Sequence, residues 1–268
     1  MRMSFPTLCR PSWLNIVGCL AIWIGAASAS ADQAAPAVAA AADLKFALPE
    51  IARAFEREGG RKLRLSFGSS GMLAQQISQG APFELFFSAD EHYVTMLQKS
   101  GRGEDGGRPY ALGRIALFLP NGSPLRADRD LRDLAAAVRD GRLKRLAIAN
   151  PEHAPYGRAA REALQHLGIW EALGDKLVLG ENAAQAAQFA ASGSAQAGII
   201  PLSLTRAPDL QARGAFVTLP ESWHAPLRQR MVLVKGAGDT ARQFYAFMQT
   251  PAALAILERH GFTPISGR

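Results

Sequence analysis

Two serines stand between two glycines in the stretch F-G-S-S-G, residues 67–71 of a 268-residue chain. The stretch follows the apolar run L-R-L-S-F and precedes the amphipathic pattern L-A-Q-Q-I, which predicts a turn from a strand into a helix. The first N–H groups of a helix lack intrahelical partners and carry partial positive charge. Small side chains let an anion approach them, and the hydroxyls of Ser69 and Ser70 add donors. These residue types therefore indicate anion binding.

The main alternative is a purely structural role for the same serines. Serine is a preferred helix N-cap, so Ser69 or Ser70 can serve only to satisfy the end of the helix. A third reading makes Ser70 the nucleophile of a secreted hydrolase. A nucleophile needs a base with an orienting group, and the sequence offers no such pair.

Motifs of catalytic and nucleotide sites are missing or poorly placed. Gly101, Gly103 and Gly106 satisfy G-x-G-x-x-G, but they follow a helix pattern, and Glu104 and Asp105 would oppose a pyrophosphate. The chain contains no G-x-S-x-G, H-E-x-x-H or G-x-x-x-x-G-K motif and no paired-cysteine metal motif. The histidines have no ligand-spaced partners and are expected at the surface or at helix ends: His92, His153, His166, His224 and His260. We therefore expect a binding protein without catalytic residues, organic cofactor or direct metal ligands.

The elements that position the serines alternate along the chain. Apolar runs predict strands at residues 35–41, 62–67, 85–88, 115–119, 145–149, 176–179, 197–201, 216–219 and 231–234. Helical patterns lie between them, at residues 49–60, 73–80, 92–101, 157–168, 183–193 and 240–261. Residues 101–109 are expected to form a turn-rich surface loop. This alternation predicts an α/β fold with parallel strands.

The first 31 residues have the order of a secretory signal. Arg2 and Arg10 precede the apolar segment W-L-N-I-V-G-C-L-A-I-W-I-G-A-A-S, and small residues follow. The apolar run is short for a membrane span, so we expect export to the periplasm with cleavage after Ala29 or Ala31. Cys9 and Cys19 would leave with the signal, and a lipid anchor on Cys19 is the alternative.

The basic residues of the chain do not form a nucleic-acid site. The formal charge is +7, but the basic residues are scattered and are not interleaved with stacking aromatics. We expect a solvated basic surface, no nucleic-acid partner and a field that attracts small anions.

A set of motifs in fixed order points to a family. These are F-G-S-S-G-M-L-A-Q-Q-I-S-Q-G-A-P-F-E-L-F-F-S-A-D, N-P-E-H-A-P-Y-G-R-A-A-R, A-G-I-I-P and the C-terminal R-H-G-F-T-P-I. With them, residues 35–265 resemble the periplasmic molybdate-binding proteins of ABC importers. The resemblance implies a type II-like binding-protein fold, in which two α/β lobes are joined by two crossover strands around a ligand cleft. Lobe I is expected over residues 32–113 and 231–268, and lobe II over residues 114–230.

The resemblance also implies how the ligand is held. The family binds molybdate or tungstate by hydroxyls and backbone amides at helix mouths, without a protein countercharge. Ser70 corresponds to the second serine of the turn, Tyr156 follows the A-P of N-P-E-H-A-P, and Ala183 would contribute its backbone N–H. Ser69 and Ser203 are further candidates. The closed form would be recognised by an inner-membrane ABC permease, and a monomer is expected because the lobes must move.

Two positions depart from the family pattern. Asp43 stands where many members have a serine opening the first helix, and Pro201 stands where many have a tyrosine, with Ser203 two residues later. Asp43 is expected to cap its own helix, with Pro49 in a helix that kinks or restarts; direct contact with the ligand is the alternative. A receptor for phosphate, sulfate or a phosphonate stays open, whereas the export signal disfavours the sensing domain of a regulator.

Overall fold

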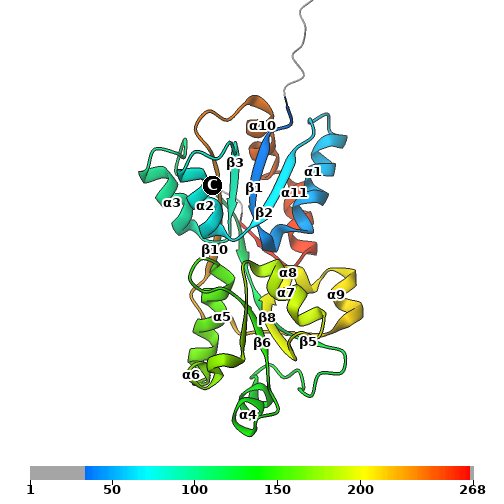
Figure 1. Ribbon diagram of the computed structural model, residues 1–268. Helices are drawn as coiled ribbons and strands as arrows, with labels where there is room; N and C mark the ends of the chain where they lie inside the picture. Colours follow the sequence, from blue (N-terminus) through cyan, green and yellow to red (C-terminus); the bar gives the residue numbers. More distant parts are fainter. Residues whose placement is uncertain (1–33, 266–268) are drawn as a thin grey trace, which may run out of the picture. The chain divides into compact units, whose positions relative to one another are not determined.

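The computed structural model describes residues 34–265, and its strands form two sheets (Figure 1). The first sheet has the order β11-β4-β10-β3-β1-β2, and the second has the order β7-β6-β8-β5-β9. The strands of the first sheet are β1 Ala37–Ala41, β2 Arg64–Gly68, β3 Leu85–Ser88, β4 Arg108–Gly113, β10 Leu227–Leu233 and β11 Thr263–Pro264. Those of the second are β5 Ile115–Pro120, β6 Leu146–Ala149, β7 Leu177–Gly180, β8 Ala197–Pro201 and β9 Gly214–Thr218. The predicted signal segment lies outside the described residues.

Helices pack on both sheets, which gives the two-lobed α/β fold that the sequence predicts. The first sheet is associated with α1 Ala47–Arg57, α2 Ser70–Ser78, α3 Glu91–Lys99, α10 Asp239–Phe247 and α11 Pro251–Arg259. The second is associated with α4 Arg132–Asp140, α5 Pro155–His166, α6 Trp170–Leu173, α7 Ala183–Ala191, α8 Leu202–Thr205 and α9 Pro208–Arg213. No helix among the described residues is long and apolar enough to cross a membrane.

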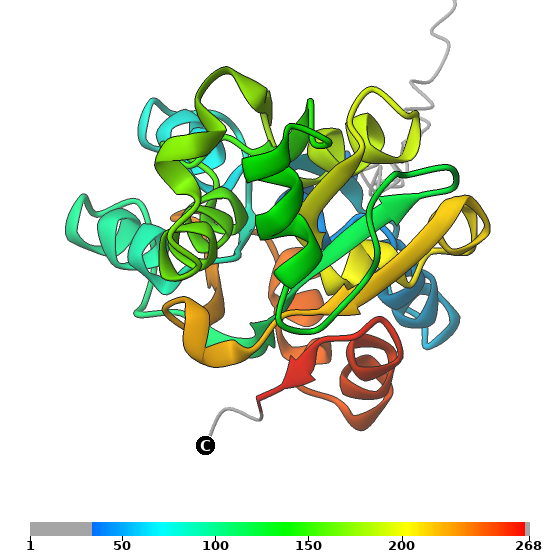
Figure 2. The ribbon, with the colours of Figure 1, turned by 90° about the horizontal axis from the view of Figure 1, so that it is seen from below.

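The expected parallel pairing is found in only part of each sheet. β1 pairs in parallel with β2 and β3, and β6 pairs in parallel with β7 and β8. However, β10 is antiparallel to both of its neighbours, β3 and β4. β5 lies between β8 and β9 and is antiparallel to both, as can be followed in Figure 2. The reason is that only strands joined through a helix return in parallel, whereas the chain passes directly from one sheet to the other before β5 and β10.

The two passages between the sheets are short and lie together. One residue, Arg114, separates β4 from β5, and residues 219–226 separate β9 from β10. The Arg114 guanidinium pairs with the Glu221 carboxylate at 2.6 Å, and the Arg114 carbonyl accepts from the Leu202 N–H at 2.8 Å. The two passages therefore tie the sheets at one place.

Several element boundaries differ from the sequence prediction for local reasons. β4 was not predicted, because only Tyr110, Ala111 and Gly113 of its residues are buried and no apolar run marks it. The sequence does not predict α4 either, because this helix begins after Leu131, which has a φ of 51° and provides no capping side chain. The single helix predicted over residues 240–261 is broken into α10 and α11, because Pro251 starts the second helix and Thr250 caps it.

Each sheet has its own apolar core. Phe55, Phe87 and Phe244 pack together under the first sheet, with ring centroids 5.3 Å apart for Phe55 and Phe244 and 6.1 Å apart for Phe87 and Phe244. In the second, the alanine-rich α7 approaches so closely that a Cβ on Gly198 would lie 2.8 Å from the Ala190 Cβ. The cores hold the helix starts at the carboxyl ends of the parallel strands.

Candidate anion-binding site

The F-G-S-S-G turn forms the start of α2, as the sequence predicts. Ser69 is the N-cap, and its Oγ accepts from the Met72 N–H at 3.4 Å. Ser70 is the first helical residue, and its Oγ accepts from the Ala89 N–H at 3.0 Å. Ser69 is therefore the serine that caps the helix. The Ser70 hydroxyl accepts one hydrogen bond, and its own O–H can still donate to a ligand.

Two further helix starts come from the second sheet. α5 begins at Pro155, after a loop of residues 150–154 that follows β6. α7 begins at Ala183 after Asn182, whose side chain caps the helix by accepting from the N–H groups of Ala184 and Gln185. A Cβ on Gly157 would lie 2.1 Å from the Ala149 carbonyl oxygen. Glycine therefore ends the motif P-Y-G because α5 must approach the end of β6 closely.

The helix starts meet at one small cavity. Its lining includes five of the predicted residues, from both sheets: Asp43, Ser69, Ser70, Tyr156 and Ala183. The remaining wall is made by small residues and one proline: Ala41, Ala42, Gly68, Ala89, Ala154 and Pro155. The cavity volume is about 10 Å³, close to the least that holds one water molecule. None of the lining side chains is basic, so any anion there would be held by hydroxyls and backbone N–H groups.

Ser203 takes a different position from the other predicted residues. It lies in α8, is buried, and donates from its hydroxyl to the Asp43 carbonyl oxygen at 2.8 Å. It does not line the cavity. Its contact instead fixes the backbone of the turn that presents Asp43.

The expectation that Asp43 caps its own helix is wrong. Asp43 lies inside a short 3₁₀ turn, Ala42–Leu44, whose N-cap is Ala41, and the N-cap of α1 is Phe46. The helix restarts at Ala47, with Pro49 in its first turn, which agrees with the restart predicted from that proline. The Asp43 carboxylate is thereby directed to residues from other elements.

A three-residue network, Asp43–Tyr156–Gln229, crosses between the sheets at the cavity. Asp43 Oδ2 accepts from the Tyr156 hydroxyl at 2.9 Å and from Gln229 Nε2 at 2.6 Å. Gln229 Nε2 also donates to the Tyr156 oxygen at 2.9 Å. A Cβ on Gly113 would lie 2.3 Å from that oxygen, so a glycine is needed where the network meets the end of β4.

Burial governs the ionisation of this network. Asp43 is only 1% exposed, and burial raises its pKa from 3.8 to about 6. The hydrogen bonds from Gln229 and Tyr156 lower the pKa, and so do the backbone N–H groups of Asp43 and Leu44. Burial also raises the pKa of Tyr156 well above its ordinary value, and the Asp43 charge raises it further. Tyr156 therefore keeps its proton and acts as a donor to Asp43.

Gln229 is a member of this network that the sequence motifs do not predict. It is fully buried in β10, where Leu227 and Met231 are buried on the same phase of the strand and Arg228 is exposed. Side chains two residues apart in a strand lie on the same face of the sheet, so Gln229 shares the buried face with Leu227 and Met231. A polar residue in this apolar alternation is the sequence feature that could have indicated its role.

Direct contacts also join the two sheets around the cavity. The Gly71 N–H donates to the His153 carbonyl oxygen at 3.0 Å, and Ser69 Oγ lies 2.9 Å from His153 Nδ1. Arg158 of α5 pairs with Asp90, which follows β3, at 2.9 Å. His153 is thus part of an inter-sheet contact, not only a surface residue. These contacts show that the two sheets are held together on the side of the helix starts.

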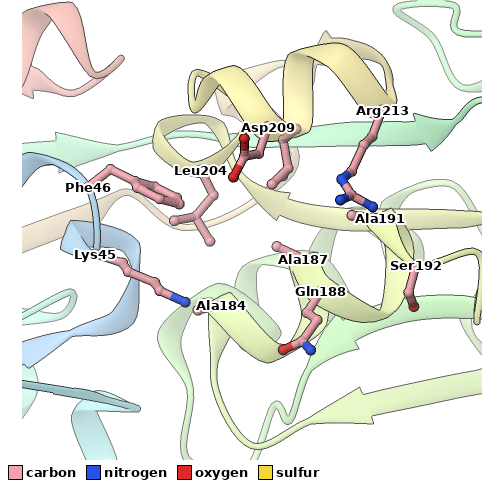
Figure 3. Close-up of a pocket in the computed structure, with 11 residues that line it drawn as sticks. Lys45, Phe46, Ala184, Ala187, Gln188, Ala191, Ser192, Leu204, Asp209 and Arg213 are labelled. Atoms are coloured by element: carbon pink, nitrogen blue, oxygen red, sulfur yellow. The ribbon is translucent and has the colours of Figure 1, made fainter.

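A larger pocket lies beside the first turn of α7. It has a volume of about 340 Å³ and lies between the segment after the 3₁₀ turn and helices α7, α8 and α9. Figure 3 shows Lys45 on one side and Asp209 and Arg213 on the other, with apolar residues between them. None of the predicted binding residues lines it, so size alone does not identify the anion site.

Comparisons with known proteins agree in family and in fold. The family described as bacterial extracellular solute-binding protein matches residues 36–263. The chain is 35% identical over 246 residues to the molybdate-binding protein ModA of Azotobacter vinelandii, covering 91% of this chain and 95% of that protein. It is 37% identical over 234 residues to ModA of Rhodobacter capsulatus, covering 85% and 89%. The solved structure of the Azotobacter vinelandii periplasmic molybdate-binding protein superposes with a TM-score of 0.78 at 30% identity, covering 85% of this chain and 98% of that one.

Proposed function

Because the chain belongs to the bacterial extracellular solute-binding protein family, we propose that it captures molybdate or tungstate outside the cytoplasm and delivers it to an ABC permease. One observation carries the proposal: helix starts from both sheets meet at a small cavity with hydroxyl and amide donors and no basic side chain. Such a site suits a small anion, because N–H groups at helix starts are unpartnered and partly positive.

The proposed contacts follow from the first turns of the helices. The Ser70 hydroxyl would donate to the anion, and the backbone N–H groups of Ser70, Tyr156 and Ala183 would add further donors. Ser69 and Ser203 would support this shell, since each already fixes a neighbouring backbone segment. Each hydrogen bond to a charged group contributes about 1.5–3 kcal/mol, so several offset the desolvation of a small oxyanion.

Capture would require the two lobes to move. A tetrahedral oxyanion is larger than the single water that the cavity admits, so the lobes would separate for its entry and close around it less tightly than in this structure. We propose lobe I over residues 32–113 and 231–268 and lobe II over residues 114–230, although all of β10, from Leu227 onward, pairs in the first sheet. The ligand would favour closure because it contacts both lobes.

The remaining parts of the proposal concern location and assembly. Residues 1–31 would act as a cleaved export signal, leaving a periplasmic monomer whose closed form docks on the permease. The family description supports a location outside the cytoplasm. Mass spectrometry of the exported protein would test the cleavage, and a lipid on Cys19 would contradict it.

Calorimetric titration tests the ligand. Protein lacking residues 1–31 would be titrated with molybdate, tungstate, sulfate and phosphate. We expect tight binding of molybdate and tungstate and weak binding of sulfate, since the backbone fixes the size of the shell. Binding of none of these anions would contradict the proposed function.

A second candidate ligand is favoured by one observation, the buried carboxyl of Asp43 at the cavity. An ionised carboxylate repels a fully deprotonated oxyanion, whereas hydrogen phosphate can donate a proton to it. Phosphate that displaced molybdate from the wild type, with the preference reversed in Asp43→Ser, would favour a receptor for protonated oxyanions.

Ser70→Ala should weaken molybdate binding by about 1–3 kcal/mol, because it removes one donor to a charged ligand. The matched control is Ser78→Ala on the same helix, where the exposed hydroxyl donates only to the Ala74 carbonyl oxygen at 2.9 Å. Calorimetry of both variants, with circular dichroism to check folding, measures the difference. If the two variants bind equally, Ser70 serves only to accept from Ala89.

A further inference from the structure

The two oxygens of the Asp43 carboxyl have unequal surroundings. Oδ2 accepts hydrogen bonds from both Tyr156 and Gln229. Oδ1 is buried and makes no hydrogen bond of good geometry within residues 34–265, although the N–H groups of Asp43 and Leu44 lie close enough to the carboxyl to lower its pKa. Since Oδ2 is occupied as an acceptor, a proton taken up by the carboxyl belongs on Oδ1. Asp43 also lines the cavity proposed for the anion.

In the described part of the chain, no cationic side chain makes a hydrogen bond or ion pair with this carboxyl that could balance a second negative charge. The titratable groups that face it are Tyr156 from α5 and Tyr110 from β4, and both have their pKa values raised by burial and by the charge of Asp43. Gln229 of β10 is neutral, and within α2, α7 and α8 there is no charged residue at all. Arg158 is paired with Asp90, and Arg230 is paired with Glu91, so each arginine already has a carboxylate partner other than Asp43.

We propose that Asp43 couples capture of the oxyanion to the uptake of one proton, which Oδ1 shares with an oxygen of the bound anion. This inference rests on the proposed function and identifies the residue that sets its pH dependence. The proton forms a bond to Oδ1 and is donated in a hydrogen bond to the ligand oxygen; no other bond is made or broken. Asp43 then supplies a hydrogen-bond donor to the ligand.

Electrostatics and burial support this assignment. Two unpaired negative charges in contact within a poorly polarisable interior repel strongly, whereas a neutral acid donates a charge-assisted hydrogen bond to the anion. Burial has already raised the Asp43 pKa to about 6, and a neighbouring anion raises it further. Hydrogen phosphate already carries a proton near neutral pH, so its capture would need no additional one.

The test is calorimetry of wild type and Asp43→Ser with molybdate between pH 6.5 and 8.5, in buffers of different ionisation enthalpy. The wild type should take up about one proton, and its Kd should rise about tenfold per pH unit. Asp43→Ser provides a hydroxyl donor that needs no proton, so uptake should vanish and Kd should stay constant. The control Asp175→Asn removes an exposed carboxylate elsewhere and should retain the wild-type slope.

A second variant tests the same proposal if Asp43→Ser does not fold. Tyr156→Phe removes one of the two donors to Oδ2, so it should raise the proton affinity of Asp43 and move the pH dependence of Kd to higher pH. Molybdate binding by the wild type without proton uptake, or an equal slope in Asp43→Ser, would overturn the inference but leave the proposed function intact. Absence of binding by the wild type would overturn both.

Discussion

Gly71→Ala should weaken oxyanion binding by up to about a hundredfold. A Cβ at this position would lie 2.7 Å from the His153 carbonyl oxygen and 3.0 Å from the Tyr93 hydroxyl. His153 belongs to the segment after β6, so the clash with it arises only when the two sheets are in contact. Overpacking of this kind costs about 1–3 kcal/mol, and its upper end corresponds to roughly a hundredfold in Kd.

The measurement is a Kd by calorimetry together with a thermal melt without ligand. Gly106→Ala is the matched control, since a Cβ there would make only an ordinary contact, 3.7 Å from the Gln98 Oε1 atom. Gly106→Ala should bind like the wild type. Tight binding by Gly71→Ala would mean that the ligand-bound form does not use the contact between Gly71 and His153.

The free energy of unfolding of Asp43→Asn, minus that of the wild type, should increase by about 3 kcal/mol as pH rises from below 4 to above 6. The pKa of Asp43 is raised from 3.8 to about 6 in the folded protein, so folding favours the protonated form. The associated stability is fully present below pH 3.8 and is lost as pH rises through 6. Each unit of pKa difference corresponds to about 1.4 kcal/mol, which gives the expected size. The asparagine oxygen can still accept from Tyr156 and Gln229.

Urea unfolding at a series of pH values measures this difference, and comparison with the wild type at each pH removes the contribution of other groups. Asp175→Asn, which changes an exposed carboxylate, serves as the control and should show no such trend. A difference between Asp43→Asn and wild type that stays constant across pH 4–8 would show that Asp43 does not bind its proton more tightly in the folded state.

The sequence predicts the helix starts at the cavity, those of α2, α5 and α7, because their signals are local. Small residues at 68–71 mark the start of α2, and Gly157 marks the close approach of α5 to β6. The family resemblance then predicts that these starts converge, and the five residues at the cavity come from segments far apart in the chain. The family and the two-lobed fold are confirmed by the comparisons.

Asp43 could not be interpreted from its neighbours. Its hydrogen-bond partners Tyr156 and Gln229 are 113 and 186 residues away in sequence. A cap depends on the next three residues, whereas this network depends on the packing of α5 and β10 against the 3₁₀ turn. The antiparallel pairing of β5 and β10 could not be predicted for the same reason, because an apolar run in the sequence does not indicate which strand it pairs with or in which direction.

The order of the strands in the first sheet sets an order of assembly. Every strand of the second sheet lies within the continuous segment from β5 to β9, whereas β10 of the first sheet, which pairs with both β3 and β4, comes after that segment. A chain that emerges N-terminus first can therefore complete the second sheet while β3 and β4 still have open edges. Open strand edges are templates for pairing with other chains. Until residue 233 has emerged, the nascent protein is therefore most exposed to aggregation at the first sheet, on which α2 with Ser70 packs.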